Sequence, residues 1–323
     1  MRPRLLNTES FCYCPEAKLL LNSFADVTFC DKLTRRQLLE KVCDVDGLIV
    51  RFAHKIDKQV IDQAKRLKVI ATAATGTNHI DVDYAKTKGM DVLSLKGETK
   101  FLKNIAATAE LTLALMLALI RKIPAAHNSV QKGLWDRNLF FGEELSGKTL
   151  GIVGYGRLGT KVARLASAFG MTILVYDPLI KKSLPRNIHQ CRTLKELLQH
   201  ADIISVHVAL NENTVGLLGK AEFRNIKKGS YLVNTSRGQV VEEQALIQAL
   251  RSGQLKGAAL DVLAEEEAKS FNLKSRAIFQ YARKNTNLIL TPHIGGATVE
   301  SMKKTEIFMA QKLKHYFQKK DSR

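Results

Sequence analysis

The sequence has few cysteines, five in 323 residues, and they are scattered along the chain. Cys12 and Cys14 are one residue apart, but no second pair of Cys or His residues at zinc spacing accompanies them. An odd and scattered set is not the disulfide framework of a small secreted domain. We therefore expect reduced thiols, a cytoplasmic protein and no metal site.

Long hydrophobic runs are absent as well. The longest apolar run, Leu111–Ile120, is about half of the ~18 residues that a membrane-spanning helix needs, so it predicts a buried helix. The N-terminal MRPRLLNTESFCYC has basic residues but neither an apolar stretch nor a small-residue cleavage site, which argues against a secretion signal. We expect no association with a membrane.

Acidic residues are in deficit. The chain has 50 Lys and Arg residues against 31 Asp and Glu residues, which gives a formal net charge of +19 at pH 7. Such an excess fits an ordinary solvated surface, a field that attracts an anionic cofactor and substrate, or binding to nucleic acid or an acidic membrane. Because the basic residues are spread along the whole chain, the sequence does not favour nucleic acid as a partner.

The chain is long enough, at 45% hydrophobic residues, for two domains with cores of their own. Short apolar runs alternate with helical patterns, which predicts parallel sheets covered by helices. The expected strands are 4–6, 27–29, 47–51, 67–73, 91–95, 149–153, 171–176, 202–206, 230–234, 257–261 and 287–290. The clearest expected helices are 15–24, 57–65, 82–88, 105–120 and 299–317. The last helix has no sheet of its own and is expected to return to the first sheet.

The strongest local signal is the stretch 148–178. A strand runs into a G-x-G-x-x-G turn, and a helix and a second strand follow. The first glycine allows a tight turn, the second lets a pyrophosphate approach the backbone, and the third lets the helix pack on the strand. Free N–H groups at the helix N-terminus favour the phosphates. The residues predicted to hold a dinucleotide here are Gly154, Gly156, Arg157, Leu158 and Gly159.

The second strand of this stretch ends in Asp177, about 20 residues after the glycines. A carboxylate at this place can accept hydrogen bonds from an adenosine ribose diol and repels a 2′-phosphate, so NAD is favoured over NADP. A kinase glycine loop is not favoured, because a helix rather than a hairpin strand follows the glycines.

Four expected strands end in reactive side chains, and ligands of open α/β sheets bind outside these carboxyl ends. The first of these strands runs into His207, and the second is followed by Arg237. The third ends in Asp261, and three glutamates follow it. The fourth is followed by His293. An isolated Arg or His at the end of a strand more often has a structural role than a functional one. The residue types alone therefore do not decide between a structural and a catalytic role.

Several longer motifs indicate a family. GIVGYGRLG, NTSRGQVVEEQAL, GAALDVLAEEE and TPHIGGAT follow one another, and the weaker LIVRFAHKI, ATGTNHID and ATAELTLALMLAL extend the match over nearly the whole chain. In these motifs the sequence resembles the D-isomer-specific 2-hydroxyacid dehydrogenase family, which includes D-3-phosphoglycerate dehydrogenases and hydroxypyruvate reductases. The resemblance implies an α/β fold of two doubly wound parallel-sheet domains with an active-site cleft between them. A Rossmann NAD-binding domain, 98–293, would be inserted in a flavodoxin-like substrate domain, 1–97 plus 294–323.

The resemblance also implies catalytic roles. Arg237 matches the arginine that pairs with the substrate carboxylate and polarises its carbonyl, and His293 matches the acid–base residue. Glu266 matches the carboxylate partner of that histidine, five residues after the strand-end Asp261. A buried anion beside His293 would raise its pKa and favour the imidazolium form. The sequence departs from the family at Glu267, where a proline is usual.

Further positions follow from the same resemblance. The cofactor would also contact His207, Thr214, Thr235, Asp261 and Gly295, with Asp261 on the nicotinamide carboxamide. The backbone of Ala74, Thr75 and Gly76 would hold the substrate carboxylate. Arg51 matches an arginine that faces the substrate phosphate in phosphoglycerate enzymes, but Thr72 stands where those enzymes have a second arginine. Because only one of the two phosphate-binding arginines is present, the sequence does not decide whether the substrate carries a phosphate.

The implied function is hydride transfer between NAD and a small anionic 2-hydroxy or 2-keto acid of the glycerate, hydroxypyruvate or 3-phosphoglycerate type. A homodimer is implied too, with helix 105–120 and Trp135 in its contact. The alternative is an NAD-sensing regulator similar to the C-terminal binding corepressors. Only the charge supports it, and Ile294 replaces the Trp that usually follows the histidine in that subfamily.

Overall fold

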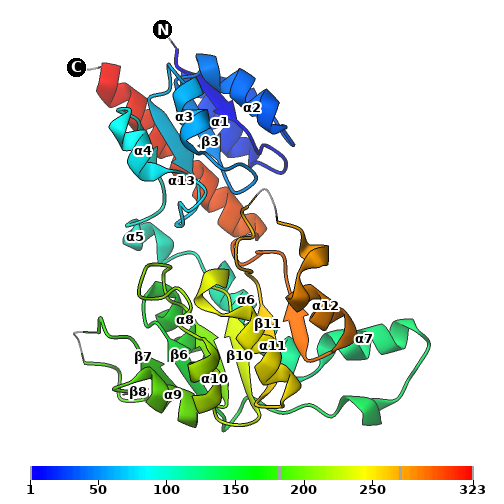
Figure 1. Ribbon diagram of the computed structural model, residues 1–323. Helices are drawn as coiled ribbons and strands as arrows, with labels where there is room; N and C mark the ends of the chain where they lie inside the picture. Colours follow the sequence, from blue (N-terminus) through cyan, green and yellow to red (C-terminus); the bar gives the residue numbers. More distant parts are fainter. Residues whose placement is uncertain (1, 181–182, 269–270, 322–323) are drawn as a thin grey trace. The chain divides into compact units, whose positions relative to one another are not determined.

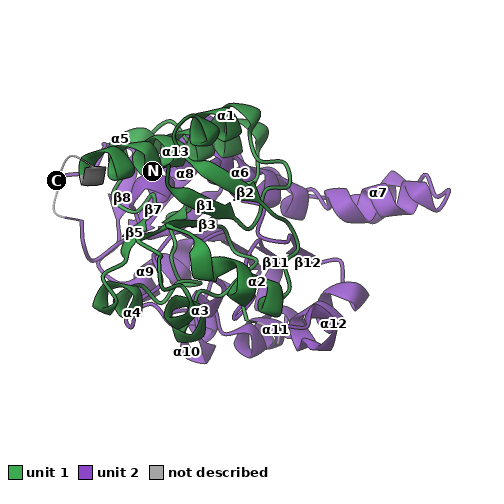
Figure 2. Cartoon of the chain, turned by 90° about the horizontal axis from the view of Figure 1, so that it is seen from above, with its two compact units in different colours: residues 1–105, 267–269, 297–323 green, residues 106–266, 270–296 purple. Residues whose placement is uncertain are grey.

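The computed structural model describes residues 2–180, 183–268 and 271–321. The chain divides into two compact units, which Figure 2 colours separately. Unit 1 comprises Met1–Ile105, Glu267–Lys269 and Ala297–Arg323, and unit 2 comprises Ala106–Glu266 and Ser270–Gly296. Each unit is built on a parallel sheet, so the α/β class predicted from the alternating pattern is confirmed.

The strands of unit 1 are β1 (Arg4–Asn7), β2 (Asp26–Phe29), β3 (Gly47–Val50), β4 (Val69–Thr72) and β5 (Asp91–Leu93). They lie in the order β2-β1-β3-β4-β5, and each pair of neighbours is parallel. Every residue of β3 and β4 is buried, because helices cover both faces of the centre of a parallel sheet. The loops after β1, β3 and β4 therefore meet at one edge of this sheet.

The helices of unit 1 are α1 (Pro15–Phe24), α2 (Arg35–Lys41), α3 (Lys58–Gln63), α4 (Val82–Thr87), α5 (Thr99–Leu102) and α13 (Val299–Asp321). The C-terminal α13 packs beside α1, as the red and blue ribbons of Figure 1 show. Its Met309, Leu313 and Phe317 are buried in one cluster with Leu5 and Leu21. The last helix thus completes the core of the first sheet.

The strands of unit 2 are β6 (Thr149–Val153), β7 (Thr172–Tyr176), β8 (Ile188–Gln190), β9 (Ile203–Val206), β10 (Ser230–Asn234), β11 (Leu255–Leu260) and β12 (Leu288–Leu290). Their order is β12-β11-β10-β9-β6-β7-β8, again with parallel neighbours. From β6 the chain first adds strands on one side and then, from β9, on the other. A change of direction of this kind marks the usual ligand edge of a doubly wound sheet.

The helices of unit 2 are α6 (Ala107–Ile120), α7 (Ile123–Gln131), α8 (Arg157–Ala168), α9 (Leu194–His200), α10 (Lys220–Asn225), α11 (Glu243–Arg251) and α12 (Ala277–Lys284). One helical stretch of the described residues, Thr99–Ile120, is long and apolar enough to cross a membrane. Half of it is buried inside the protein, and a core helix meets the same criterion. α6 is such a helix, because it packs against α8 and the sheet.

The strand β8 was not predicted from the sequence. Its three residues include one apolar side chain, Ile188, and it pairs only with β7 at the edge of the sheet. A short and mostly polar edge strand has no hydrophobic alternation to reveal it. The other strands of both sheets overlap the predicted ranges.

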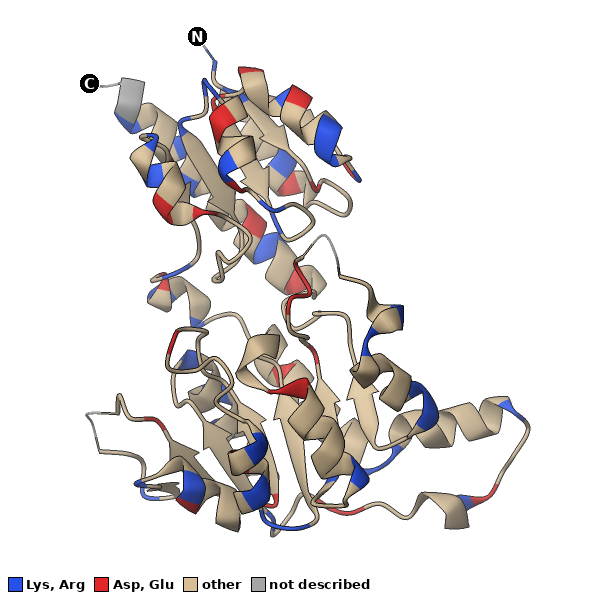
Figure 3. Ribbon diagram, viewed as in Figure 1, with Lys and Arg blue, Asp and Glu red and all other residues tan. Residues whose placement is uncertain are grey.

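The basic residues are distributed over the helices and loops of both units (Figure 3). Several are paired with acidic residues, for example Lys148 with Glu143 at 2.6 Å and Lys227 with Asp202 at 2.6 Å. The positive excess is thus spread over the surfaces of the two units.

Candidate active site

The turn between β6 and α8 has the geometry that its three glycines predict. Gly154 has a φ of +92°, and a Cβ there would lie 2.9 Å from the carbonyl carbon of His207. A Cβ on Gly159 would lie 2.2 Å from the carbonyl oxygen of Gly154. In contrast, a Cβ on Gly156 would meet no atom within 4 Å. The first and third glycines permit close packing, whereas the second borders open space where a pyrophosphate can lie.

The N-terminus of α8 faces this open space without a side-chain cap, because Gly156 occupies the N-cap position. Uncapped N–H groups and the helix dipole form an anion site. Arg157 and Leu158 are half-buried in the first turn. These residues therefore fit the phosphates of a dinucleotide.

Asp177 lies beside this turn, at the end of β7. Its carboxylate accepts hydrogen bonds from the N–H groups of Tyr155 and Leu179, both at 2.9 Å. Asp177 also lines a cavity of 340 Å³ together with Gln190, the last residue of β8, and Arg192 in the loop after it. The cation Arg192 was not predicted as part of this site, because its position depends on the unpredicted strand β8.

His207 follows β9 and is held in the neutral form. Its Nε2 is 2.7 Å from the hydroxyl of Ser205, and burial lowers the pKa of His207 to about 4. Its Nδ1 has no hydrogen-bond partner among the described residues. In the loop beyond, the hydroxyl of Thr214 accepts from the N–H of Asn211 at 2.8 Å and donates to the carbonyl of Ala209 at 2.7 Å. Thr214 therefore shapes this loop.

The loop after β10 is organised by the buried Asn234. Its side-chain oxygen accepts from the N–H of Ser236 at 3.0 Å, and its amide donates to the carbonyl of Arg237 at 2.9 Å. The guanidinium of Arg237 donates to the carbonyl of Ser236 at 2.6 Å. A Cβ on Gly238 would lie 1.9 Å from the carbonyl carbon of Leu263. Only a glycine thus lets the loop of Arg237 lie directly against the loop that follows β11.

The loop after β12 is held by the buried carboxylate of Asp261, at the end of β11. It accepts from the hydroxyl of Thr291 at 2.6 Å and from the N–H groups of Ile294 and Gly295, both at 2.8 Å. Burial raises the pKa of Asp261, and these three donors oppose the rise. One carboxylate thus fixes the segment that carries His293.

His293 and Glu266 are in direct contact. The Nδ1 of His293 is 2.5 Å from a carboxylate oxygen of Glu266, whose other oxygen accepts from the N–H of Leu263 at 3.1 Å. His293 has a φ of +53°, and its N–H donates to the carbonyl of Asp261 at 2.8 Å. Burial by itself lowers the pKa of His293, and so does the charge of Arg237. The hydrogen bond and charge of Glu266, together with the charge of Asp261, outweigh both, so the net shift of this pKa is upward.

The start of α6 forms hydrogen bonds to the loops after β10 and β12. These contacts were not predicted from the sequence. The hydroxyl of Thr108 donates to the carbonyl of Gly295 at 2.9 Å, and the hydroxyl of Thr112 lies 2.8 Å from that of Thr235. Thr235 is buried. Thr108 and Thr112 lie in the weak motif ATAELTLALMLAL, which does not indicate these contacts, so only the fold reveals their contribution.

The substrate-binding residues predicted in unit 1 lie at the carboxyl ends of β3 and β4. Ala74–Gly76 follow β4, and the carbonyl of Ala74 accepts from the N–H of Leu95 at 2.9 Å. Arg51 follows β3 and forms an ion pair with Glu306 of α13. The structure therefore places both predicted segments at one edge of the sheet, with the charge of Arg51 already paired.

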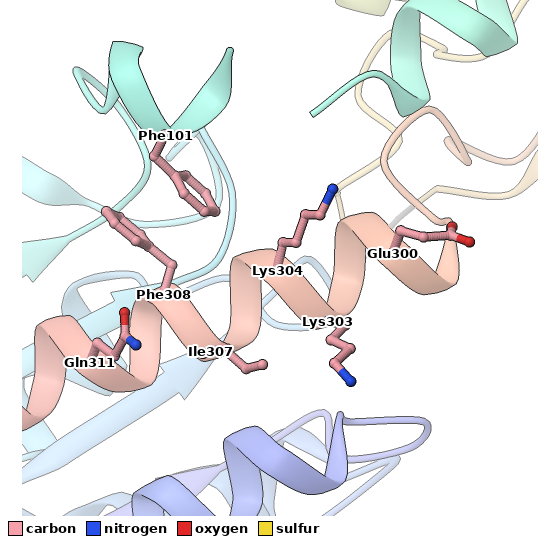
Figure 4. Close-up of a pocket in the computed structure, with 7 residues that line it drawn as sticks. All are labelled: Phe101, Glu300, Lys303, Lys304, Ile307, Phe308 and Gln311. Carbon is pink, nitrogen blue, oxygen red and sulfur yellow. The ribbon is translucent and has the colours of Figure 1, made fainter. Parts of the chain in front are cut away.

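A larger cavity, of 420 Å³, lies along α13 in unit 1 (Figure 4). The rings of Phe101 and Phe308 stack there with their centroids 4.0 Å apart. None of the predicted site residues lines it. Among the described residues, no group of three or more His, Cys, Asp or Glu side chains is placed to hold a metal ion.

Comparisons with known proteins identify relatives by sequence and by fold. A family model described as D-isomer specific 2-hydroxyacid dehydrogenase, NAD binding domain, matches residues 113–295. The chain is 38% identical over 301 residues to D-3-phosphoglycerate dehydrogenase of Methanocaldococcus jannaschii, a match that covers 93% of this chain and 55% of that protein. The chain spans about half the length of the curated relatives it matches.

Two solved structures show the same fold. TT0316 protein from Thermus thermophilus has a TM-score of 0.82 and 34% identity, over 95% of this chain and 94% of that one. D-Lactate dehydrogenase from Aquifex aeolicus, complexed with NAD and lactic acid, has a TM-score of 0.82 and 26% identity, over 98% of this chain and 95% of that one.

The contact between His293 and Glu266 predicts a measurable pKa. We expect NMR titration of the His293 ring to give a pKa above 6.5 in the wild type. In Glu266→Gln the opposing effect of burial dominates, so the pKa falls by about one unit or more. Because the folded-state pKa is raised, the pair stabilises the fold fully at low pH, and this contribution is lost as pH rises through that pKa.

The exposed neighbour Glu265 provides the control. Glu265→Gln removes the same charge from the same loop and is expected to leave the His293 pKa close to that of the wild type. Equal pKa values in the wild type and Glu266→Gln would contradict the pairing.

Proposed function

We propose that this chain, which belongs to the D-isomer specific 2-hydroxyacid dehydrogenase family, is an oxidoreductase that moves a hydride between NAD and a small D-2-hydroxy acid. The observation that carries the proposal is the contact of His293 with Glu266, on a loop against which the loop of Arg237 packs at Gly238. A carboxylate-binding cation beside a paired acid–base group is what reduction of a 2-keto acid requires.

Bound NAD supplies the hydride acceptor or donor. The turn of Gly154, Gly156 and Gly159 would hold its pyrophosphate, and Asp177 its adenosine ribose. The unpaired Nδ1 of the neutral His207 would contribute a polar contact at the end of β9. Asp261, Thr235 and Gly295 lie at the carboxyl ends of β10, β11 and β12 and would contact the cofactor there.

The chain's own side chains would perform the acid–base step. The planar guanidinium of Arg237 would bind the substrate carboxylate through two hydrogen bonds and polarise the neighbouring carbonyl. His293, whose pKa is raised by its contact with Glu266, would give a proton to the C2 oxygen and take it back in the reverse direction. Glu266 would stabilise the imidazolium and fix its ring.

The substrates we propose are the small acids of the glycerate, hydroxypyruvate and 3-phosphoglycerate type. The names of the relatives differ on this point, since one is a D-3-phosphoglycerate dehydrogenase and another is complexed with lactic acid. The backbone of Ala74–Gly76, which follows β4, would hold the substrate carboxylate. Arg51 is the residue that would bind the phosphate group of a phosphorylated substrate.

We also infer a homodimer. The segment from α7 to Phe141 extends away from the rest of unit 2 (Figures 1 and 2) and exposes large apolar side chains. Trp135 is 89% exposed and Phe141 is 74% exposed. A second copy of this chain would remove this apolar surface from water.

A cytoplasmic location is proposed as well. The five cysteines are free, and Cys14 and Cys191 are buried as thiols. Burial raises the pKa of Cys191 to about 11, so this thiol stays protonated and unreactive. Free thiols of this kind suit a reducing compartment.

The activity is tested by NADH oxidation with a panel of 2-keto acids. We expect turnover in the wild type and a fall in kcat/KM on the order of 10² or more in Arg237→Ala, because the carboxylate loses its partner and the carbonyl its polarising charge. Arg224→Ala, which removes an exposed arginine of unit 2, is the control and should keep full activity. Full turnover by Arg237→Ala would reject the assignment of that residue.

Cofactor choice is tested at Asp177. We expect the wild type to prefer NAD to NADP, and Asp177→Ala to lose that preference, because the repulsion of the 2′-phosphate disappears while Arg192 remains in the same cavity. The ratio of kcat/KM for NADH and NADPH is the measurement. An unchanged ratio would show that Asp177 is not the ribose acceptor.

A further inference from the structure

We propose that Glu306 and Glu9 make the end of β3 selective for substrates with a single negative charge, so that this chain acts on a 2-hydroxy acid without a phosphate group. The inference rests on the proposed dehydrogenase activity and narrows its substrate class. It depends on three features of unit 1: an occupied backbone anion site, a neutralised arginine and a missing second cation.

The backbone after β3 forms an anion site that the chain itself fills. The N–H groups of Arg51, Phe52 and Ala53 donate to the carboxylate of Glu9, at 2.8, 3.3 and 3.2 Å. Successive N–H groups that converge on one point bind anions such as phosphate and carboxylate. Because Glu9 occupies this point, a substrate phosphate would have to displace a carboxylate that already has three donors.

The guanidinium of Arg51 is occupied in the same way. Its Nη2 pairs with one carboxylate oxygen of Glu306, a side chain that is fully buried. The other oxygen of Glu306 accepts from the N–H of Cys14 at 2.6 Å. Removing Arg51 from this pair would leave a buried carboxylate without its counter-charge, which is strongly unfavourable.

The position of Arg51 is fixed on its other side by an aromatic ring. Its guanidinium carbon lies 5.7 Å from the centroid of the buried Tyr13. Contact with an aromatic face and with a carboxylate orients a planar guanidinium fully. Arg51 is therefore held by the protein on two sides, in a direction set by α13 and the loop after β1.

The neighbouring strand supplies no replacement charge. β4 is adjacent to β3 and ends in Thr72, which is uncharged and fully buried. The carboxyl ends of these two strands precede the loops on which substrate recognition in unit 1 is proposed to depend. A dianionic phosphate at the end of β3 would meet the carboxylates of Glu9 and Glu306 and an arginine already paired with Glu306, whereas a neutral hydroxyl would not be repelled.

The test compares hydroxypyruvate with 3-phosphohydroxypyruvate, with NADH as the reductant. We expect the wild type to prefer hydroxypyruvate by about tenfold or more in kcat/KM, and Glu306→Gln to raise the relative kcat/KM of the phosphorylated acid by about tenfold. The amide keeps an oxygen for the N–H of Cys14 but frees the charge of Arg51. Circular dichroism and thermal unfolding establish that the variant is folded.

Glu98→Gln is the matched control, because it removes an acidic partner of α13 at another place, the ion pair with Lys312. This variant should keep the wild-type ratio of the two substrates. A wild type that prefers the phosphorylated acid, or a ratio in Glu306→Gln equal to that in Glu98→Gln, would overturn the inference while leaving the dehydrogenase activity intact.

Binding separates this inference from the proposed activity. If no variant oxidises NADH, the proposed function is wrong, and calorimetric titration with glycerate and 3-phosphoglycerate decides the charge selectivity alone. Binding of 3-phosphoglycerate that is gained only in Glu306→Gln supports the role of Glu306. Equal binding, or equal lack of binding, in all three proteins overturns it.

Discussion

The candidate active site depends on one buried carboxylate. Asp261 directly follows β11 and accepts three hydrogen bonds from the segment that follows β12, so the ends of two parallel strands are joined through a single side chain. A buried charge is stable only with such a set of donors, and this requirement fixes the conformation of the whole segment. His293 follows from it: its backbone is placed by Asp261 and its ring by Glu266.

Close approach of loops is the second constraint. Gly238 allows the loop of Arg237 to touch that of Glu266, and Gly154 and Gly159 allow the β6–α8 turn to pack on its neighbours. Within that turn, Gly156 borders open space. Unit 1 differs in this respect, because Glu9 occupies the backbone donors after β3 and Glu306 pairs with Arg51. The anion site at the β6–α8 turn is thus open, as the proposed cofactor NAD requires. The anion site after β3 is filled by Glu9, which is the basis for proposing a substrate without a phosphate group.

Much of this arrangement could be predicted from the sequence, for physical reasons. Buried strands such as β3, β6 and β10 are largely apolar runs, and reactive residues directly after them, such as Arg237, must lie at one edge of a parallel sheet. The contributions of Thr108 and Glu306 could not be predicted, because each acts on a residue more than 180 positions away and no local pattern indicates that contact. Arg192 was missed because the short polar strand β8 has no hydrophobic period.

The central claim is that the ends of β10, β11 and β12 form a single site for hydride transfer to a 2-keto acid. The most direct measurement is the fate of deuterium from NADH deuterated at both C4 positions during reduction of hydroxypyruvate, followed by NMR and chiral analysis of the product. We expect the label at C2 of a product that is entirely the D isomer. A product without deuterium at C2, or a racemic product, would contradict the account.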